Sequence, residues 1–301
     1  MKVTAASASL LVVAALSELC VAVPAKRGDS GAPTDIQILN FALTLEHLEN
    51  AFYTQGLQKY TQQDFLDADL PAWARGRWNE IAQHESTHVS FLESVIGDQA
   101  VQPCTYSFPD TDPMSFVTTS FMLETVGVSA YSGAAQFLAN SDYITSSGAI
   151  LAVEARQSAW INSAVLKANP WNTAFDTPLD LDHVWTLASG VIVSCPSSNM
   201  PLPVKAFPAL SFPADAQPGK TVTVSFNATT TSEQLYVAFI AGLGATFVPL
   251  SSQMTVEIPS TLQGVVFPVV TSSDTTVTDN VTIAGPAFLT FHFNSDGEDE
   301  Q

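Results

Sequence analysis

Residues 80–95 read EIAQHESTHVSFLESV, and this segment has the periodicity of a helix with one apolar face. At helical spacing, Glu85 and His88 lie one turn apart on that face, beside Leu92. An ionised carboxylate is costly to bury without a partner. The pair therefore predicts either a bound metal ion or a set of buried hydrogen-bond partners, and the other helices must decide between the two.

Helical periodicity predicts four long helices and a shorter fifth one in the first two thirds of the chain. The expected ranges are 35–60, 71–96, 114–140, 147–169 and 179–195. A polar, aspartate-rich link is expected between the first two helices. A crossover loop with two prolines is expected after Cys104, because proline cannot continue a helix. The segment as a whole predicts a four-helix bundle with a short fifth helix.

Beyond Pro196 the composition changes from helical to β-rich. A linker rich in Pro and Ser is expected at residues 197–203, and short β segments occupy residues 204–294. Their spacing predicts a small antiparallel β-sandwich, so the expected fold class is α+β multidomain. We interpret His292 as a solvated strand residue and expect no catalytic or metal-binding set in this part. An acidic tail, residues 295–301, follows.

The first and third long helices each carry a glutamate followed by a tyrosine seven residues later. These pairs are Glu46 with Tyr53 and Glu124 with Tyr131. Seven residues are two helical turns, so each glutamate and its tyrosine share one face of their helix. Glu49 is interpreted as an adjacent or surface carboxylate and ranks below Glu46, because it lacks this spacing to a tyrosine.

The fourth helix carries Glu154-x-x-Gln157, which matches Glu85-x-x-His88 on the second helix except at its last residue. One glutamate from each of two helices and a Glu-x-x-His from each of the other two form the ligand plan of di-iron carboxylate bundles. The sequence therefore predicts a site for one or two ions of Fe, Mn or Zn. The expected ligands are Glu46, Glu85, His88, Glu124 and Glu154. The residues expected beside these ligands are Glu49, His84, Tyr53, Tyr131 and Gln157.

Gln157 departs from the ligand plan, which has histidine at this position. A glutamine offers only a neutral amide oxygen, which is a weaker ligand than imidazole for these metals. Binding of a single ion, or weaker binding of a second one, follows from this change. His84 or His183 could fill the gap, but His84 lies beside the correct stripe and His183 is expected on the surface. The alternative is a metal-free layer of hydrogen-bonded, partly protonated carboxylates.

Residues 35–196 resemble the ferritin-like domain of secreted fungal stress-response and late sexual development proteins, which are related to plant desiccation-related proteins. The phrases that carry the resemblance are NFALTLEHLENAFY, IAQHESTHVSFL, FMLETVGVSAY, ILAVEARQSAW and IVSCP. The later phrases YVAFIAGL, FVPL and AGPAF resemble the β extension of the fungal members. The resemblance implies a ferritin-like bundle in a stress or developmental protein, and it brings no defined reaction.

The N-terminal segment predicts secretion. Lys2, an apolar run, small residues and then Lys26-Arg27 have the layout of a signal peptide with a dibasic processing site, so residues 1–27 are assigned to it and 28–196 to the helical domain. In an oxidising compartment Cys104 and Cys195 are expected to form a disulfide rather than remain separate thiols. Sequons at Asn227 and Asn280 predict glycans.

The charge of the chain excludes several partners. Without residues 1–27 the chain has 7 basic and 28 acidic residues, and a surface this acidic repels nucleic acid and anionic membranes. After the signal segment, no run is long and apolar enough for a membrane helix. We therefore expect an extracellular or cell-wall protein that binds neither nucleic acid nor membrane; its oligomeric state stays open.

Three functions remain open at this stage. The first is a metal-dependent oxidoreductase or metal-handling protein. The second is a non-catalytic extracellular protein of stress or development, whose bundle keeps a metal-free polar core. The third is a binding module whose strands contact a cell-wall or matrix component. Measurement of bound metal separates the first function from the other two.

Overall fold

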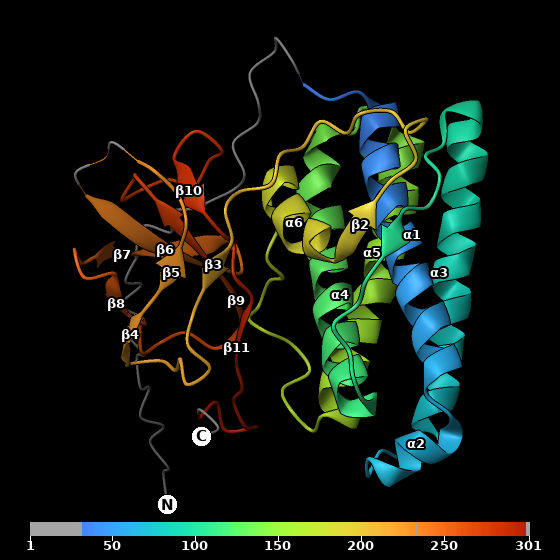
Figure 1. Ribbon diagram of the computed structural model, residues 1–301, viewed down its shortest axis with the longest axis horizontal. Coiled ribbons are helices and arrows are strands. Elements are labelled where there is room, and N and C mark those ends of the chain that lie inside the picture. Colours follow the sequence, from blue (N-terminus) through green and yellow to red (C-terminus); the bar gives the residue numbers. More distant parts are fainter. Residues whose placement is uncertain (1–31, 231, 233, 299–301) are drawn as a thin grey trace, which may run out of the picture.

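The computed structural model describes residues 32–230, 232 and 234–298. The expected signal segment, residues 1–27, and the last three residues of the expected acidic tail lie outside the described residues. Figure 1 shows the helices on one side of the molecule and most of the strands on the other. The α+β class is therefore confirmed, with helices first and antiparallel strands after them.

Four long helices form the bundle. They are α1 (Asp35–Lys59), α3 (Ala74–Ile96), α4 (Pro113–Ala134) and α5 (Ser141–Trp160). Helix α1 packs mainly on α3, and α4 packs mainly on α5, so the bundle consists of two helix pairs (Figure 1). A shorter helix, α6 (Leu181–Ala188), covers one end of α4.

Several boundaries differ from the sequence-based prediction because of local capping. The polar link after α1 contains a short helix, α2 (Gln62–Asp67), which begins with a capping box between Thr61 and Asp64. Helix α5 begins six residues earlier than expected, because the Asn140 side chain caps it. After Trp160 it continues as a π-helical turn, Ile161–Val165, and not as α-helix to residue 169.

The helices predicted at residues 114–140 and 179–195 are shorter in the structure. Helix α4 gives way to a 3-10 turn at Ala135–Phe137, before the predicted end at residue 140. Helix α6 ends at Ala188, and the segment after it forms a 3-10 turn and strand β2 (Ile192–Ser194). The run GVIV, residues 190–193, is rich in β-branched residues, which favour the extended strand over the helix.

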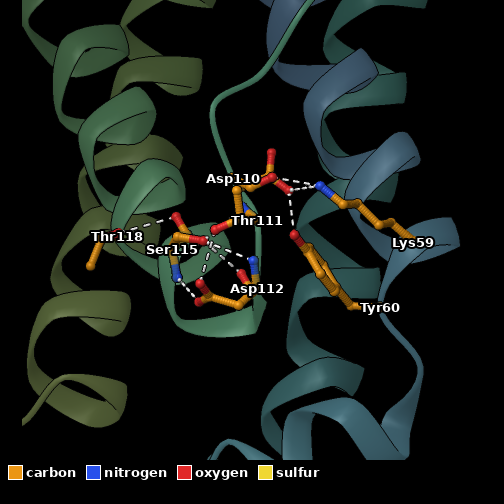
Figure 2. Close-up of polar contacts among 7 residues, drawn as sticks. All are labelled: Lys59, Tyr60, Asp110, Thr111, Asp112, Ser115 and Thr118. Carbon is orange, nitrogen blue, oxygen red and sulfur yellow. Dashed lines mark hydrogen bonds and ion pairs between the residues drawn. The ribbon is translucent and has the colours of Figure 1, made fainter.

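The crossover segment that joins the two helix pairs is fixed at its end by the contacts in Figure 2. The Asp110 carboxylate accepts hydrogen bonds of 3.1 Å from Lys59 Nζ and 2.8 Å from the Tyr60 hydroxyl, at the end of α1. Two residues later Asp112 caps α4 by accepting from the Ser115 backbone N–H, at 2.8 Å. The start of α4 is thereby held beside the end of α1.

The expected disulfide between Cys104 and Cys195 is present, with 4.2 Å between the two Cα atoms. Directly beside it, strand β1 (Thr105–Tyr106) pairs antiparallel with β2, with Thr105 opposite Ser194. The bond closes a loop of 91 residues, which contains α4, α5 and α6. Cross-linking a loop of this length restricts the unfolded chain, which stabilises the folded one.

The β-rich part contains one five-stranded antiparallel sheet and two short strand pairs. The sheet has the order β10-β9-β6-β7, and β11 also pairs with β9. Its strands are β6 (Leu235–Ala241), β7 (Gly244–Leu250), β9 (Gly264–Thr271), β10 (Thr282–Ala284) and β11 (Leu289–Phe291). The pairs are β3 (Leu210–Ser211) with β5 (Ser225–Phe226) and β4 (Thr221–Thr223) with β8 (Thr255–Glu257).

The central strands of the sheet, β6 and β9, are largely buried, and their alternate residues point to opposite sides of the sheet. On β6, Val237 and Phe239 belong to a core shared with the two short strand pairs. Their neighbours Ala238 and Ile240 belong to the core of the helical bundle instead. The helices and the sheet therefore share one continuous hydrophobic core.

Two histidines are placed differently from the prediction. His183 on α6 was expected at the surface, but it is buried, with Nε2 3.2 Å from the Thr282 hydroxyl on β10. His292 was expected in solvent, but it is half-buried, with Nδ1 3.1 Å from Asn169 Oδ1. Both lie where helical segments meet the sheet, a contact between distant segments that strand alternation alone does not predict.

Within residues 32–298, leaving aside positions 231 and 233, no helix has both the length and the apolar character needed to cross a membrane. The longest helix, α1, contains charged and polar side chains within its span.

Candidate metal centre

Three helices bring four of the five predicted ligands together in the middle of the bundle. Glu46 comes from α1, Glu85 and His88 from α3, and Glu154 from α5. Each offers one ligand atom, and these atoms lie within 4.8 Å of one another. The three glutamates are fully buried, while the His88 side chain is 12% exposed. Residues more than a hundred positions apart in the chain thus meet in one small volume.

The fifth predicted ligand, Glu124 on α4, is fully buried beside this group but not part of the closest set. Its Oε1 accepts a hydrogen bond from the Tyr53 hydroxyl on α1. In the same manner the Tyr131 hydroxyl on α4 donates to Glu46 Oε1 on α1, at 2.5 Å. Each tyrosine therefore orients the glutamate of the opposite helix, and not the glutamate seven residues away on its own helix.

Glu49, interpreted from the sequence as an adjacent or surface carboxylate, is buried beside the closest ligand set and is not part of it. It is 4% exposed and points into the bundle instead of towards solvent. A Cβ atom added at Gly127 on α4 would lie 3.1 Å from Glu49 Oε1 and 2.4 Å from Glu154 Oε2. Glycine at position 127 therefore leaves room for two carboxylates that approach the same point.

Gln157 lies in the site, at the position predicted for a histidine. Its Nε2 donates to Glu85 Oε1 at 3.0 Å and lies 3.3 Å from His84 Nδ1. His84 is largely exposed to solvent, so this histidine meets the edge of the site through Gln157 and does not replace the missing ligand. His183 lies against Thr282 of the β sheet and does not fill the gap either.

Four oxygen atoms in this cluster are buried without a hydrogen-bond partner in the described part of the chain. They are Glu124 Oε2, Glu154 Oε1, Glu154 Oε2 and Gln157 Oε1. A buried polar atom without a partner costs about 1–3 kcal/mol, and more when it is charged. Oxygen atoms from carboxylates and amides are the ligands that hard cations prefer. The residues present therefore fit a bound metal ion.

Burial and mutual repulsion act on the carboxyl groups of the site. Burial is the main reason that the pKa values of Glu49, Glu124 and Glu154 lie well above the ordinary value, and the neighbouring glutamates raise them further. For Glu85, burial also dominates and raises the pKa to about 7, against the hydrogen bond from His88, which lowers it. In the absence of a cation, protons would have to neutralise part of this charge.

His88 is the only basic side chain that touches these carboxylates in the part of the chain that the structure describes. Its Nδ1 lies 2.9 Å from Glu85 Oε2 and 3.2 Å from Glu46 Oε2. Burial alone would lower the pKa of the imidazole, but the hydrogen bonds to the two glutamates outweigh it and raise the pKa to about 10. One positive charge balances one of the five carboxylates.

Comparison with known proteins defines the class. Residues 34–167, which include all the residues of the site, match the model of the ferritin-like domain family. The helical part of this chain thus resembles a ferritin-like domain. Over 179 residues the chain is 28% identical to protein rds1 of Schizosaccharomyces pombe; the match covers 58% of this chain and 44% of that relative. These two matches together support a fungal ferritin-like protein.

Proposed function

We propose that the ferritin-like domain binds one or two ions of iron, manganese or zinc between α1, α3, α4 and α5. The four buried oxygen atoms without a protein partner carry this proposal, together with the cluster of Glu46, Glu85, His88 and Glu154. A cation would satisfy these oxygens and balance the carboxylates at once. Without one, several protons must be held in the interior instead.

The two ends of the site offer different ligands. Near α3, the cluster has the imidazole of His88 with Glu46 and Glu85, a nitrogen and oxygen set that suits iron, manganese or zinc. Near Gly127, the donors are the oxygens of Glu154 and Glu49, without an imidazole. We infer that the position near α3 binds a metal more tightly than the oxygen-only position does. The oxygen-only position favours harder ions such as Mn²⁺.

The chemistry proposed for the site depends on the metal. Bound iron or manganese would supply one-electron redox chemistry, and zinc would not. The chain itself holds the carboxylates in place through Tyr53 and Tyr131, and it excludes bulk water, since every glutamate of the site is buried. We propose that the protein handles metal or acts as a metal-dependent oxidoreductase.

We further propose that the protein is secreted and acts in stress or developmental physiology. The disulfide and the lack of a membrane-spanning helix among the described residues are compatible with an extracellular protein. The signal-like N-terminus and the sequons at Asn227 and Asn280 support the same proposal. Asn280 is exposed in a turn before β10, where a glycan has room.

Elemental analysis of the natively purified protein tests the metal proposal. We expect between one and two ions of iron, manganese or zinc per chain, and we expect none in the variant with Glu85→Ala and His88→Ala. The helical circular dichroism signal should be the same in both proteins, since the rest of the core is unchanged. Equal metal content in the two proteins would refute the assignment of the ligands.

The second candidate function is a non-catalytic extracellular protein with a metal-free polar core. The hydrogen bonds from Tyr53 and Tyr131 to the glutamates favour it, because they would satisfy part of a protonated carboxyl layer. Chelation separates the two candidates. Removal of a bound ion lowers the melting temperature, because a ligand at 100 times its dissociation constant stabilises the fold by about 2.7 kcal/mol. A metal-free core gives no change with a chelator.

A further inference from the structure

A cavity separate from the metal centre lies where the helical bundle meets the sheet. It has a volume of about 270 Å³. Its walls come from α4, α5, the segment of residues 169–177 and Phe267 of β9. None of the five glutamates of the metal centre lines it. The volume is close to the lower end of small-molecule sites, about 300 Å³, so it suits one ring-sized ligand.

The segment of residues 169–177, here named the pocket loop, is anchored to the sheet. Asn172 Oδ1 accepts a hydrogen bond of 2.9 Å from the Val265 backbone N–H on β9. Thr177 Oγ1 accepts one of 2.7 Å from the Gly242 backbone N–H. At the other end of the loop, Asn169 Nδ2 donates to the Trp171 carbonyl at 2.8 Å. The loop that presents Trp171 is thus held in place before any ligand arrives, which reduces the entropy lost on binding.

The cavity combines an aromatic ring with polar groups. Trp171 lines it and is 67% exposed, the highest value among the large hydrophobic side chains that the structure describes as exposed. The helices contribute Thr125 and Ser158, whose hydroxyl oxygens lie 2.9 Å apart, and Arg156 to the lining. Asp176 of the pocket loop adds a carboxylate. Asn162 Oδ1, which also lines the cavity, is buried without a hydrogen-bond partner among the described residues, and an apolar ligand would leave it so.

The charges of the cavity favour a neutral ligand. One arginine and one aspartate line the cavity, so its walls carry no net charge. The whole chain has a formal net charge of −19, which repels anions at a distance. A neutral ligand with many hydroxyls on its edge and an apolar face for the indole ring matches this lining. A sugar ring has these two surfaces.

We propose that this cavity binds a single ring of a neutral saccharide, with the ring packed on Trp171 and its hydroxyls bonded to the polar groups of α4, α5 and the pocket loop. The inference does not depend on the metal centre. It also places saccharide binding at the junction of helices and sheet, and not on the strands alone. A fragment with only the β-rich part would lack α4 and α5, and so would not bind.

Calorimetric titration of the full chain with methyl glycosides of glucose, mannose and N-acetylglucosamine tests the proposal. At least one should bind with a dissociation constant of about 1 mM, as expected for one small ring. Glucuronate, which has the same ring and a negative charge, should bind at least about ten-fold more weakly. No binding of any neutral glycoside up to about 20 mM, or tighter binding of glucuronate, would overturn the proposal.

Two aromatic variants locate the site. Trp171→Ala should weaken binding at least about ten-fold, because the stacking surface is lost. Phe175→Ala is the matched control: Phe175 belongs to the same loop and is 58% exposed, but it does not line the cavity. The dissociation constant of this variant for the saccharide should lie within about two-fold of the value for the unchanged chain. Equal affinity in the Trp171→Ala variant, with the fold intact by circular dichroism, would show that saccharide binds elsewhere.

Discussion

The Tyr131 hydroxyl on α4 donates a 2.5 Å hydrogen bond to Glu46 Oε1 on α1. The reciprocal bond runs from Tyr53 on α1 to Glu124 on α4. The two helices are therefore antiparallel at this level, and they exchange equivalent contacts across the bundle. The seven-residue spacing between glutamate and tyrosine on each helix follows from this exchange, because each glutamate sits opposite the tyrosine of the other helix.

Removal of both hydroxyls should weaken metal binding. In the Tyr53→Phe, Tyr131→Phe variant, Glu46 and Glu124 lose the donors that fix their orientation. Loss of such orienting partners typically lowers metal affinity about 10–100-fold. Titration with Mn²⁺ against a competing chelator measures this change. Tyr236→Phe, on strand β6, is the control and should bind as the unchanged chain does; an unaltered affinity in the double variant would contradict the role given to the tyrosines.

Gly127→Ala should lower metal content without unfolding α4. The added Cβ would lie 2.4 Å from Glu154 Oε2, so this carboxylate must move away from the site. Alanine favours the helix over glycine by about 1 kcal/mol, which keeps α4 folded. Gly148→Ala on α5 meets no atom within 4 Å and should leave the metal content unchanged. Full metal content in the Gly127→Ala variant would show that this side of the site binds no ion.

Gln157→His should add a nitrogen ligand to the metal centre. The amide oxygen of Gln157 is buried without a hydrogen-bond partner in the described residues, and its side chain reaches Glu85. An imidazole at this position would restore the second Glu-x-x-His, and a nitrogen ligand binds Fe²⁺ or Zn²⁺ better than an amide oxygen does. We expect elemental analysis to show more bound ions per chain than before the substitution. No increase would argue against a second position.

His183 should make the fold less stable in acid. Burial lowers its pKa to about 4, against 6.5 in the unfolded chain. Above pH 6.5 the residue is neutral in both states and has no effect. Between pH 6.5 and about 4 only the unfolded chain gains the proton. The free energy of unfolding therefore decreases as the pH is lowered through this range, by about 3 kcal/mol in total.

Chemical denaturation at several pH values measures this effect. His183→Gln keeps a side-chain donor for Thr282 but does not titrate, so its unfolding free energy should fall less between pH 6.5 and 4. Carboxylates titrate alike in both proteins, and the difference between the two curves therefore isolates His183. Parallel curves would contradict the proposed cause.

The helices were predictable from sequence because their apolar stripes repeat at helical spacing, as in the segment around Glu85 and His88. The ends were less predictable, since caps such as Asn140 and the extended segment after α6 depend on local hydrogen bonds and on strand pairing. The strands β6 and β9 were recognisable as β-rich. Their burial on both faces was not, because it requires knowing that the bundle covers one side.

The site was predictable where a ligand lies on an apolar stripe at a repeated spacing, as Glu46 and Glu154 do. Whether Glu49 is an adjacent or a surface carboxylate was not predictable, because its inward direction depends on Gly127 of another helix, a contact between segments far apart in sequence. His183 was misplaced for the same reason: its burial comes from strand β10, a hundred residues further along the chain. Spacing within one helix carries no information about either contact.

Anomalous diffraction at the iron, manganese and zinc absorption edges tests the metal centre most directly. Crystals of the natively purified chain should show an anomalous peak about 2.0–2.3 Å from oxygen atoms of Glu46, Glu85 or Glu154 and from a ring nitrogen of His88. A weaker peak on the side of Gly127 would mark the second position. Well-ordered crystals of the full-length chain with no anomalous peak among these side chains would contradict the account.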